Sequence, residues 1–371
     1  MTVKSVYFVL RAPGRPEATN YQHGSISLAE GLRELGIPFF SNIPYWQNAP
    51  DSEFLFQSDP EVKPQDCDVV VLEHCWFDYV DAPRLPQCLL ARRRAFRSVY
   101  LDLSDGFATR SWPLARYFDL VLRGHYSSQY MHPRNAVPWA FGLTNRILRE
   151  LKTPPDWDCR AQRLLWNFRV PHAVRHWAAM EFLPRFREIA ADEAACGAME
   201  NCGDGEYERL HWRQTGRRHH RSYFASLQAC RFCAAFGGRF IPAWPRHPSM
   251  TLGQRIVNRL SPVLNRVLPA KERVYQWDSW RLWESLAAGC ATICLDFEKY
   301  GFVLPAMPRN FVHYIGVDMD DPAAACRVIG SNRQLAPQIA REGRDWAIAN
   351  YSPLAVARRF LDLLTKEHPA L

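Results

Sequence analysis

The chain has 371 residues, of which 47% are hydrophobic and 13% aromatic, so it is long and apolar enough for two domains with separate cores. No apolar run reaches the length of a membrane span, and the apolar start Val6–Leu10 is too short for a signal peptide, so we expect a cytoplasmic protein. The formal net charge of +8 favours an anionic partner, which could be a nucleotide, an anionic membrane surface or a nucleic acid.

The eleven cysteines indicate neither a disulfide framework nor a metal site. They are scattered and odd in number, and several lie within apolar runs, which is typical of buried, reduced thiols. Cys230–Cys233 is the only C-x-x-C pair, and a zinc site would need a second one, so we expect no metal. The densest basic clusters, 92–94 and 217–221, are either solvated helix faces or contacts for the anionic partner.

The start of the chain is typical of a Rossmann-like domain. Val6–Leu10 predicts a buried strand, residues 23–36 repeat apolar side chains at helical spacing and stop at Gly36, and residues 37–40 predict a second strand. Doubly wound α/β folds begin with a strand, a loop, a helix and a strand in this order. The G-x-G-x-x-G fingerprint is absent, so the sequence does not predict a nicotinamide site.

Three more strands are predicted at residues 68–73, 98–103 and 120–123, with a basic helix at 89–96 between two of them. Ligands of open α/β sheets bind at the carboxyl ends of the strands. The polar residues at these ends are Glu73, His74, Asp102, Asp105, Arg123 and His125. They are site candidates, although the two aspartates also suit a turn.

The second half of the chain begins after a proline-containing linker at 152–158. A predicted strand at 163–167 leads into a segment in which Arg169, His172 and Arg175 lie within seven residues. These cationic groups either bind an anion or pair with structural carboxylates, and the sequence leaves both explanations open.

A long insertion at 239–275 follows the glycine turn at 237–238. Its basic amphipathic stretch, 251–268, rests on a membrane surface, caps the ligand site or packs as a helical hairpin on its own domain. The other predicted elements are helices at 176–200, 223–229 and 353–364, a helix that ends before Asn350, and strands at 232–236 and 311–317.

Residues 279–296 are the most informative stretch, because they predict a helix that runs directly into a buried strand. Asp278 and Ser279 are good N-cap residues, and apolar residues follow them at helical spacing. Gly289 suits the end of the helix, and Ala291–Leu295 is a short apolar run.

The start of this helix suits a phosphate, because its free amides stand beside Ser279 and Arg281. Glu284, one turn further along, could accept hydrogen bonds from a ribose diol. The alternative is an ordinary amphipathic helix in which Arg281 and Glu284 form a surface pair.

Residues 279–293, Ser-Trp-Arg-Leu-Trp-Glu-Ser-Leu-Ala-Ala-Gly-Cys-Ala-Thr-Ile, resemble the nucleotide-sugar-binding helix of GT-B fold glycosyltransferases. The resemblance is strongest to the exostosin-like and spore-maturation-type family, with its pattern Ser-x-Arg-x-x-Glu-Ala-Leu-Ala-x-Gly-Cys-x-Pro-Ile. A looser likeness extends from His219 to Gly238. Thr292 replaces the usual proline, and Gln276 stands where retaining members have a second acidic residue, so inversion and retention both remain open.

The resemblance implies an α/β protein of two Rossmann-like domains that face one another across a cleft, the GT-B fold. It implies an N-terminal acceptor-binding domain at 1–152 and a C-terminal nucleotide-sugar-binding domain at 159–345 that contains the insertion at 239–275. The terminal helix at 346–371 is then expected to cross back to the first domain.

The resemblance also implies the site. The nucleotide-sugar-binding residues would be Arg169, His172, Arg175, Gly238, Ser279, Trp280, Arg281 and Glu284. Their charges and the helix dipole would stabilise the departing diphosphate without a metal, and no cofactor is expected besides the nucleotide-sugar donor. An inverting enzyme also needs a base on the acceptor hydroxyl, for which His23 is the first choice and Asp105 the second.

The main hypothesis is therefore a glycosyltransferase that moves a hexose or pentose to a glycan, a lipid-linked acceptor or a small molecule. Contact of residues 251–268 with the inner face of a membrane is one option within it. A second hypothesis is a sugar transferase acting on DNA, or a basic nucleic-acid-binding protein, whose binding would fall steeply with salt. A third is a GT-B-like sugar-nucleotide epimerase or a non-catalytic sensor.

Overall fold

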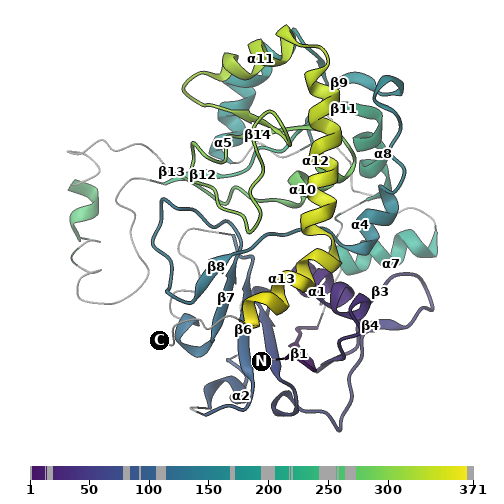
Figure 1. Cartoon of the computed structure of the whole chain (residues 1–371), viewed down its shortest axis with the longest axis vertical. Helices are drawn as coiled ribbons and strands as arrows, with labels where there is room; N and C mark the ends of the chain where they lie inside the picture. The colour runs from purple at the N-terminus through teal and green to yellow at the C-terminus, as the bar shows by residue number, and fades with distance from the viewer. Residues whose placement is uncertain are drawn as a thin grey trace.

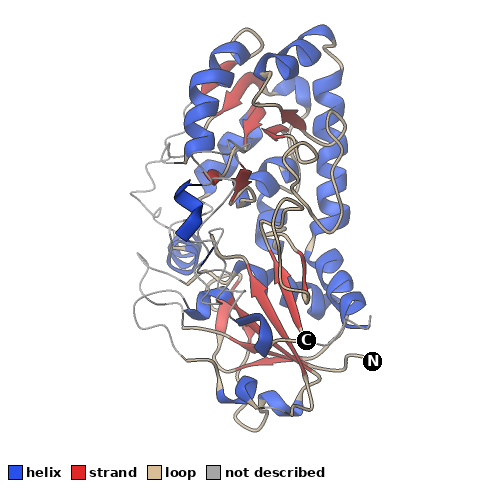
Figure 2. Cartoon of the chain, turned by 90° about the vertical axis from the view of Figure 1, so that its left-hand side faces the viewer, coloured by secondary structure: helices blue, strands red, loops and turns tan. Residues whose placement is uncertain are grey.

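The computed structural model contains two parallel β-sheets, one in each half of the chain, which lie one above the other (Figure 1, Figure 2). It describes residues 2–12, 14, 20–77, 84–91, 93–105, 114–167, 172–193, 205–216, 218, 220–241, 256, 259–263 and 273–365. Arg169 lies outside the described residues, as does most of the basic stretch 251–268. None of the described helices is long and apolar enough to cross a membrane.

The sheet of the N-terminal half has six parallel strands in the order β2-β1-β5-β6-β7-β8. These strands are β1 (Val6–Val9), β2 (Phe39–Ser41), β5 (Val69–Glu73), β6 (Arg97–Asp102), β7 (Leu120–Arg123) and β8 (Ala136–Pro138). Runs such as Val-Val-Val-Leu in β5 are buried throughout, because helices and loops cover both faces of a parallel sheet. The strand order reverses between β1 and β5, which is where doubly wound sheets bind ligands.

The sheet of the C-terminal half has five parallel strands in the order β10-β9-β11-β14-β15. They are β9 (Ala161–Leu165), β10 (Ala191–Glu193), β11 (Cys230–Ala234), β14 (Ala291–Leu295) and β15 (Ile315–Val317). The order of strands along the chain is the same as in the first sheet, with the second strand outside the first. The predicted fold class, α/β with two Rossmann-like domains, is therefore confirmed.

Helices cover both sheets and connect the strands. In the N-terminal half they are α1 (His23–Glu34), α2 (Gln87–Leu90) and α4 (Asn145–Glu150), with 3-10 turns at Pro64–Asp66, His74–Phe77, Ala115–Tyr117 and Trp157–Cys159. In the C-terminal half they are α5 (Ala173–Trp177), α6 (Leu183–Phe186), α7 (Glu206–Thr215), α8 (Arg221–Ala229), α10 (Trp280–Ala287), α11 (Pro322–Ser331), α12 (Leu335–Tyr351) and α13 (Pro353–Thr365). Two antiparallel ribbons complete the fold, one of β3 (Tyr45–Gln47) with β4 (Phe54–Phe56) and one of β12 (Arg239–Ile241) with β13 (Arg273–Tyr275).

The last helix, α13, packs against α1 of the N-terminal half (Figure 1). The two helices approach closely at Gly31, where an added Cβ would lie 1.9 Å from the carbonyl oxygen of Pro353. At the other end of α13, Arg97 Nη1 of β6 donates to the Leu364 carbonyl at 2.7 Å. The end of the chain thus ties the C-terminal half back to the N-terminal half.

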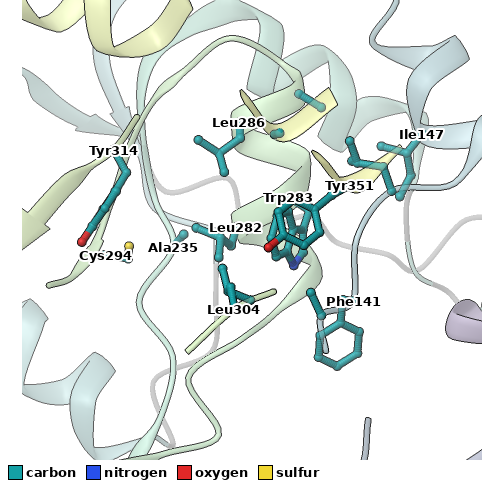
Figure 3. Packing of buried hydrophobic residues seen from close by; sticks show 14 of the residues in the cluster. Phe141, Ile147, Ala235, Leu282, Trp283, Leu286, Cys294, Leu304, Tyr314 and Tyr351 are labelled. Atoms are coloured by element: carbon teal, nitrogen blue, oxygen red, sulfur yellow. The ribbon is translucent and has the colours of Figure 1, made fainter. Parts of the chain in front are cut away.

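One hydrophobic cluster continues from one half into the other. Figure 3 shows Trp283 of α10 beside Tyr351 at the end of α12, with Phe141 of the N-terminal half nearby. The ring centres of Trp283 and Tyr351 are 4.3 Å apart, and both side chains are almost completely buried. This shared core fixes α10 relative to both sheets.

Three predicted elements are wrong in type or extent. The basic stretch 89–96 is not a helix beyond Leu90, because Arg94 instead ties the loop to the Leu89 and Tyr117 carbonyls. The predicted helix at 176–200 passes through a π-helical turn at Ala178–Phe182 and ends at Phe186, after which β10 joins the sheet. Pro184 lacks the N–H that a continuous α-helix needs there.

The predicted strand at 311–317 is shorter than expected, because only Ile315–Val317 pairs with β14. Phe311 has a φ of 55° and its N–H bonds to the Tyr314 carbonyl at 2.8 Å, so the chain turns before the strand begins. The β3–β4 ribbon was not predicted at all.

Candidate functional site

The carboxyl ends of the two sheets face one another, and the polar residues that follow the strands lie in the space between them. Asp105 comes after β6 in the N-terminal half, and His172 and Arg175 come after β9 in the C-terminal half. Their charges act on one another. The Asp105 carboxylate favours the protonated forms of His172 and Arg175 and so opposes the lowering of their pKa values by burial. His172 in turn contributes to lowering the pKa of Asp105. Residues that the sequence placed in separate domains therefore meet at one site.

Two arginines and one imidazole gather on the C-terminal side of this site, and we call His172, Arg175 and Arg281 the cation cluster. Burial lowers the pKa of Arg175 to about 10, and the charge of Arg281 adds to the effect. Burial also lowers the pKa of His172, and the nearby arginines, including Arg175 and Arg281, lower it further. Arg175 is held by a 3.0 Å hydrogen bond from Nε to the Phe236 carbonyl. Like charges are thus kept together, which suits an anionic ligand.

The start of α10 lies in the same place. Ser279 occupies the N-cap position, but its hydroxyl does not cap the helix, and no described residue hydrogen-bonds it although the oxygen is shielded from solvent. Asp278 instead anchors the turn, since its carboxylate accepts the Phe141 N–H at 3.1 Å and the Trp283 indole N–H at 2.8 Å. No side chain therefore caps the start of α10, and Arg281 of the cation cluster lies in its first turn, a combination that suits a phosphate.

Glu284 points inward rather than along the surface, since only 3% of it is exposed. If Glu284 pairs with Arg281, the pair is therefore not the solvent-exposed one of an ordinary amphipathic helix. The charge of Glu284 acts on two tyrosine hydroxyls. Burial is the main cause that raises the pKa of Tyr223 well above its usual value, and the Glu284 carboxylate is the second cause. Burial also raises the pKa of Tyr21, and the Glu284 carboxylate adds to that rise. A buried carboxylate therefore lies one turn into α10, beside the start of the helix.

Trp280, the first residue of α10, packs its indole among Tyr21, His23 and Phe141 of the N-terminal half. The ring centres are 5.8, 6.0 and 5.3 Å from that of Trp280, respectively. Arg218 lies over the indole at 4.9 Å. We call this cluster the aromatic joint, because it connects α10 to the N-terminal half.

The two candidate bases, His23 and Asp105, have different surroundings. His23 is 1% exposed, and its Nδ1 and Nε2 lie 3.0 Å from the Tyr21 hydroxyl and 3.2 Å from the Gly142 carbonyl. The carbonyl can only accept, so Nε2 carries a proton. The side chain of Asp105, by contrast, is 69% exposed.

Asp105 stands among imidazoles. Partial desolvation acts to raise its pKa, but His125, His74 and His172 outweigh this effect and hold the pKa below its usual value. His125 Nε2 lies 3.5 Å from Asp105 Oδ1, and its Nδ1 accepts the Asp278 N–H at 3.0 Å. His125 therefore connects the carboxylate to the start of α10. The sequence indicated His125 only as a strand-end residue, because this contact joins positions 153 residues apart.

Gly238 lies where no other residue fits. Its φ is 114°, and an added Cβ would be 2.8 Å from the Tyr275 carbonyl oxygen and 2.7 Å from Val274. The Gly238 carbonyl accepts the N–H of Val174 in α5 at 3.3 Å. The glycine thus lets the loop after β11 pack between α5 and β13, beside the cation cluster. Arg169 of the predicted set lies outside the described residues.

Among the described residues, Glu73, His74 and Cys75 are close enough to one another to hold a metal ion. The Glu73 carboxylate already accepts the Ser25 N–H and hydroxyl, at 2.9 and 2.6 Å, and the Gly24 N–H at 3.4 Å. An acidic group at the start of α1 is what the helix dipole favours. This cluster is therefore explained by the N-terminus of α1.

No protein-family model and no curated protein matches this sequence. Among solved structures, the chain is similar to an alpha-glucosyltransferase in complex with UDP-glucose and DNA containing an abasic site, with a TM-score of 0.50 and 9% identity over 99% of this chain and 100% of that one. An alpha-glucosyltransferase with UDP and a 13-mer DNA gives a TM-score of 0.50 and 10% identity over the same shares. The chain has the GT-B fold. At this identity the likeness shows the fold alone, and in a GT-B protein the site described above lies between the two Rossmann-like domains.

Proposed function

We propose that the protein is a glycosyltransferase that moves a sugar from a nucleotide-diphosphate sugar to an acceptor hydroxyl. The observation that carries the proposal is the meeting of the cation cluster, the uncapped start of α10 and the buried Glu284 at one place. A diphosphate would neutralise the gathered positive charge, and the carboxylate of Glu284, which can accept several hydrogen bonds, would accept from the hydroxyls of a ribose. Together these groups suit the ribose and the diphosphate of a nucleotide sugar.

In the proposed reaction the acceptor oxygen forms a bond to the anomeric carbon while the bond from that carbon to the phosphate oxygen breaks. The nucleoside diphosphate leaves with its charge stabilised by Arg175, Arg281 and the amides of α10, without need of a metal or another cofactor. In an inverting enzyme the acceptor proton passes to Asp105, which is exposed and ionised at neutral pH. His23 has both ring nitrogens engaged, so we assign it to positioning rather than to proton transfer.

The acceptor is proposed as a glycan, a lipid-linked molecule or a small molecule. A second candidate is DNA, which the net charge of +8 favours and which is present in the structures of the two similar glucosyltransferases. The finer relationship, to exostosin-like and spore-maturation-type enzymes, rests on residues 279–293. Contact with a membrane through 251–268 and a place in the cytoplasm remain proposals from the sequence pattern.

Calorimetry with UDP, GDP, ADP, CMP and dTDP tests the donor site. We expect the wild type to bind one of these nucleotides selectively and Arg281→Ala and Glu284→Ala to lose about tenfold or more in affinity, as the loss of a charged hydrogen bond predicts. Arg327→Ala is the matched control, because this arginine pairs with Asp321 on the exposed side of α11. A folded wild type that binds none of the five nucleotides would remove the basis of the proposal.

A further inference from the structure

Tyr223, the third residue of α8, has a buried hydroxyl without a partner. Its oxygen is shielded from solvent, and no residue in the described part of the chain hydrogen-bonds it. An unsatisfied buried hydroxyl costs about 1–3 kcal/mol, and native proteins contain few of them. The amphipathic pattern of α8, with Phe224 and Leu227 in the core, does not predict a polar role for this residue.

The topology places the start of α8, and Tyr223 with it, at the same end of the second sheet as the start of α10. The helix α8 leads directly into β11, and α10 leads through Gly289 into β14. Since β11 and β14 are parallel neighbours, both helices begin at the carboxyl end of the second sheet.

Two contacts keep α8 beside α10. At the start of α8, Arg218 lies over the ring of Trp280 at 4.9 Å. At its end, Cys290 Sγ, just after α10, donates to the Leu227 carbonyl at 3.2 Å. Tyr223 lies between these contacts, where the charges of Glu284 and Arg281 act on its hydroxyl.

The two groups have complementary hydrogen-bonding capacity. A carboxylate such as that of Glu284 only accepts hydrogen bonds, whereas a phenol both donates and accepts. A ribose diol offers two adjacent hydroxyls, so one of them can donate to Glu284 while the other accepts from Tyr223. An isolated phosphate oxygen would be repelled by Glu284, and an apolar group would leave the phenol unsatisfied.

We propose that Tyr223 binds the ribose diol of the donor together with Glu284 and thereby selects ribonucleotide over deoxyribonucleotide donors. This inference rests on the proposed function, because it assigns a partner within the same donor site. A site built to hydrogen-bond a substrate hydroxyl rejects the analogue without it, since its own polar groups are then left unpaired.

The test is calorimetry of the wild type and Tyr223→Phe with UDP, GDP and ADP, each compared with its 2′-deoxy and 3′-deoxy forms. We expect the wild type to bind the ribonucleotide that it prefers about tenfold more tightly than at least one deoxy form. We expect Tyr223→Phe to lose about five- to tenfold in affinity for the ribonucleotide and most of the discrimination. Without ligand, its melting temperature should equal or exceed that of the wild type, because the variant removes a hydroxyl that has no partner.

Tyr314→Phe is the matched control. The Tyr314 hydroxyl accepts the Phe297 N–H at 2.9 Å, so its removal should lower the melting temperature and leave nucleotide affinity unchanged. The inference is overturned if Tyr223→Phe behaves like this control, or if the wild type binds ribonucleotides and both deoxy forms equally well. A wild type that binds no nucleoside diphosphate contradicts the proposed function itself, and that outcome is distinct from the other two.

Discussion

The two sides of the first turn of α10 are built in opposite ways. On one side, the indole of Trp280 packs against three aromatic rings of the N-terminal half. On the other side, Ser279 has a buried hydroxyl without a partner in the described part of the chain, and Arg281 adds its charge to that of Arg175. The first side resembles a protein core and the second side resembles a binding site.

This difference separates two jobs within one short helix. The aromatic joint fixes the position of α10 relative to the N-terminal half. The cation cluster, by contrast, keeps like charges close together, and an anionic ligand would relieve their repulsion. Substitutions on the joint side should therefore reduce stability, and those on the cluster side should reduce binding or turnover while stability is kept.

The largest expected effect is on turnover. Asp105→Asn removes the proposed base but keeps the size of the side chain, so turnover of the sugar nucleotide should fall at least about 100-fold while nucleotide affinity stays within about twofold. Steady-state kinetics with calorimetry on the same sample measures both. Glu61→Gln, at an exposed carboxylate of the same half, is the control. Unchanged turnover in Asp105→Asn would exclude this residue as the base and favour a retaining mechanism.

On the joint side, Trp280→Ala should lower the free energy of unfolding by about 3 kcal/mol, because a packed indole is lost from between the two halves. Urea unfolding measures the change. The resemblance instead placed Trp280 among the nucleotide-sugar-binding residues. A variant with wild-type stability and no nucleotide binding would favour that assignment over a role in the aromatic joint.

The elements that sequence predicted well are those fixed by local pattern. The stretch 279–296 gave a helix and a strand that the structure has as α10 and β14, because an N-cap residue, an apolar stripe and a glycine stop lie within a few residues of each other. The strand at 120–123 matches β7 at both ends, since it is a short apolar run between polar residues.

The features that sequence missed depend on long-range contacts. Apolar spacing at 176–200 cannot distinguish one helix from a π-helical turn followed by an edge strand, and only pairing with β9 makes Ala191–Glu193 a strand. Two aromatic partners of Trp280, His23 and Phe141, lie more than 130 residues away in the sequence. The polar role proposed for Tyr223 was not predicted for the same reason, since it depends on the position of Glu284, which is distant in the sequence.

The contact between α1 and α13 extends the joint side, and it offers a smaller test. Gly31→Ala should lower the free energy of unfolding by about 2 kcal/mol, because the new methyl group would meet the Pro353 carbonyl. Gly330→Ala in α11 is the matched control, since nothing lies within 4 Å of its added methyl group. There the change should stabilise the helix by about 0.5–1 kcal/mol. Equal effects of the two variants on thermal unfolding would mean that α13 does not pack tightly on α1.

The last test concerns Asp278, whose carboxylate accepts the Phe141 N–H and the Trp283 indole N–H beside the start of α10. Burial raises its pKa to about 6, although His125 and the N–H groups of Phe141 and Trp283 act against this. In the unfolded chain the carboxyl loses its proton at a lower pH, near the ordinary value of 3.8. The stability from this group is therefore fully present below that value and is lost as the pH rises through 6.

Asp278→Asn lacks this titration. The free energy of unfolding of the wild type, minus that of the variant, should therefore fall by about 1.4 kcal/mol per pH unit between about pH 4 and 6 and stay level above this range. Urea unfolding at half-unit steps of pH measures the difference. A difference independent of pH would mean that the Asp278 carboxylate keeps its charge in the folded protein. The 3.0 Å contact of His125 is with the backbone N–H of Asp278 and does not stabilise that charge directly. In that case a charged carboxylate would lie directly beside the aromatic joint, and the division between a packed side and a charged side of α10 would end at Asp278.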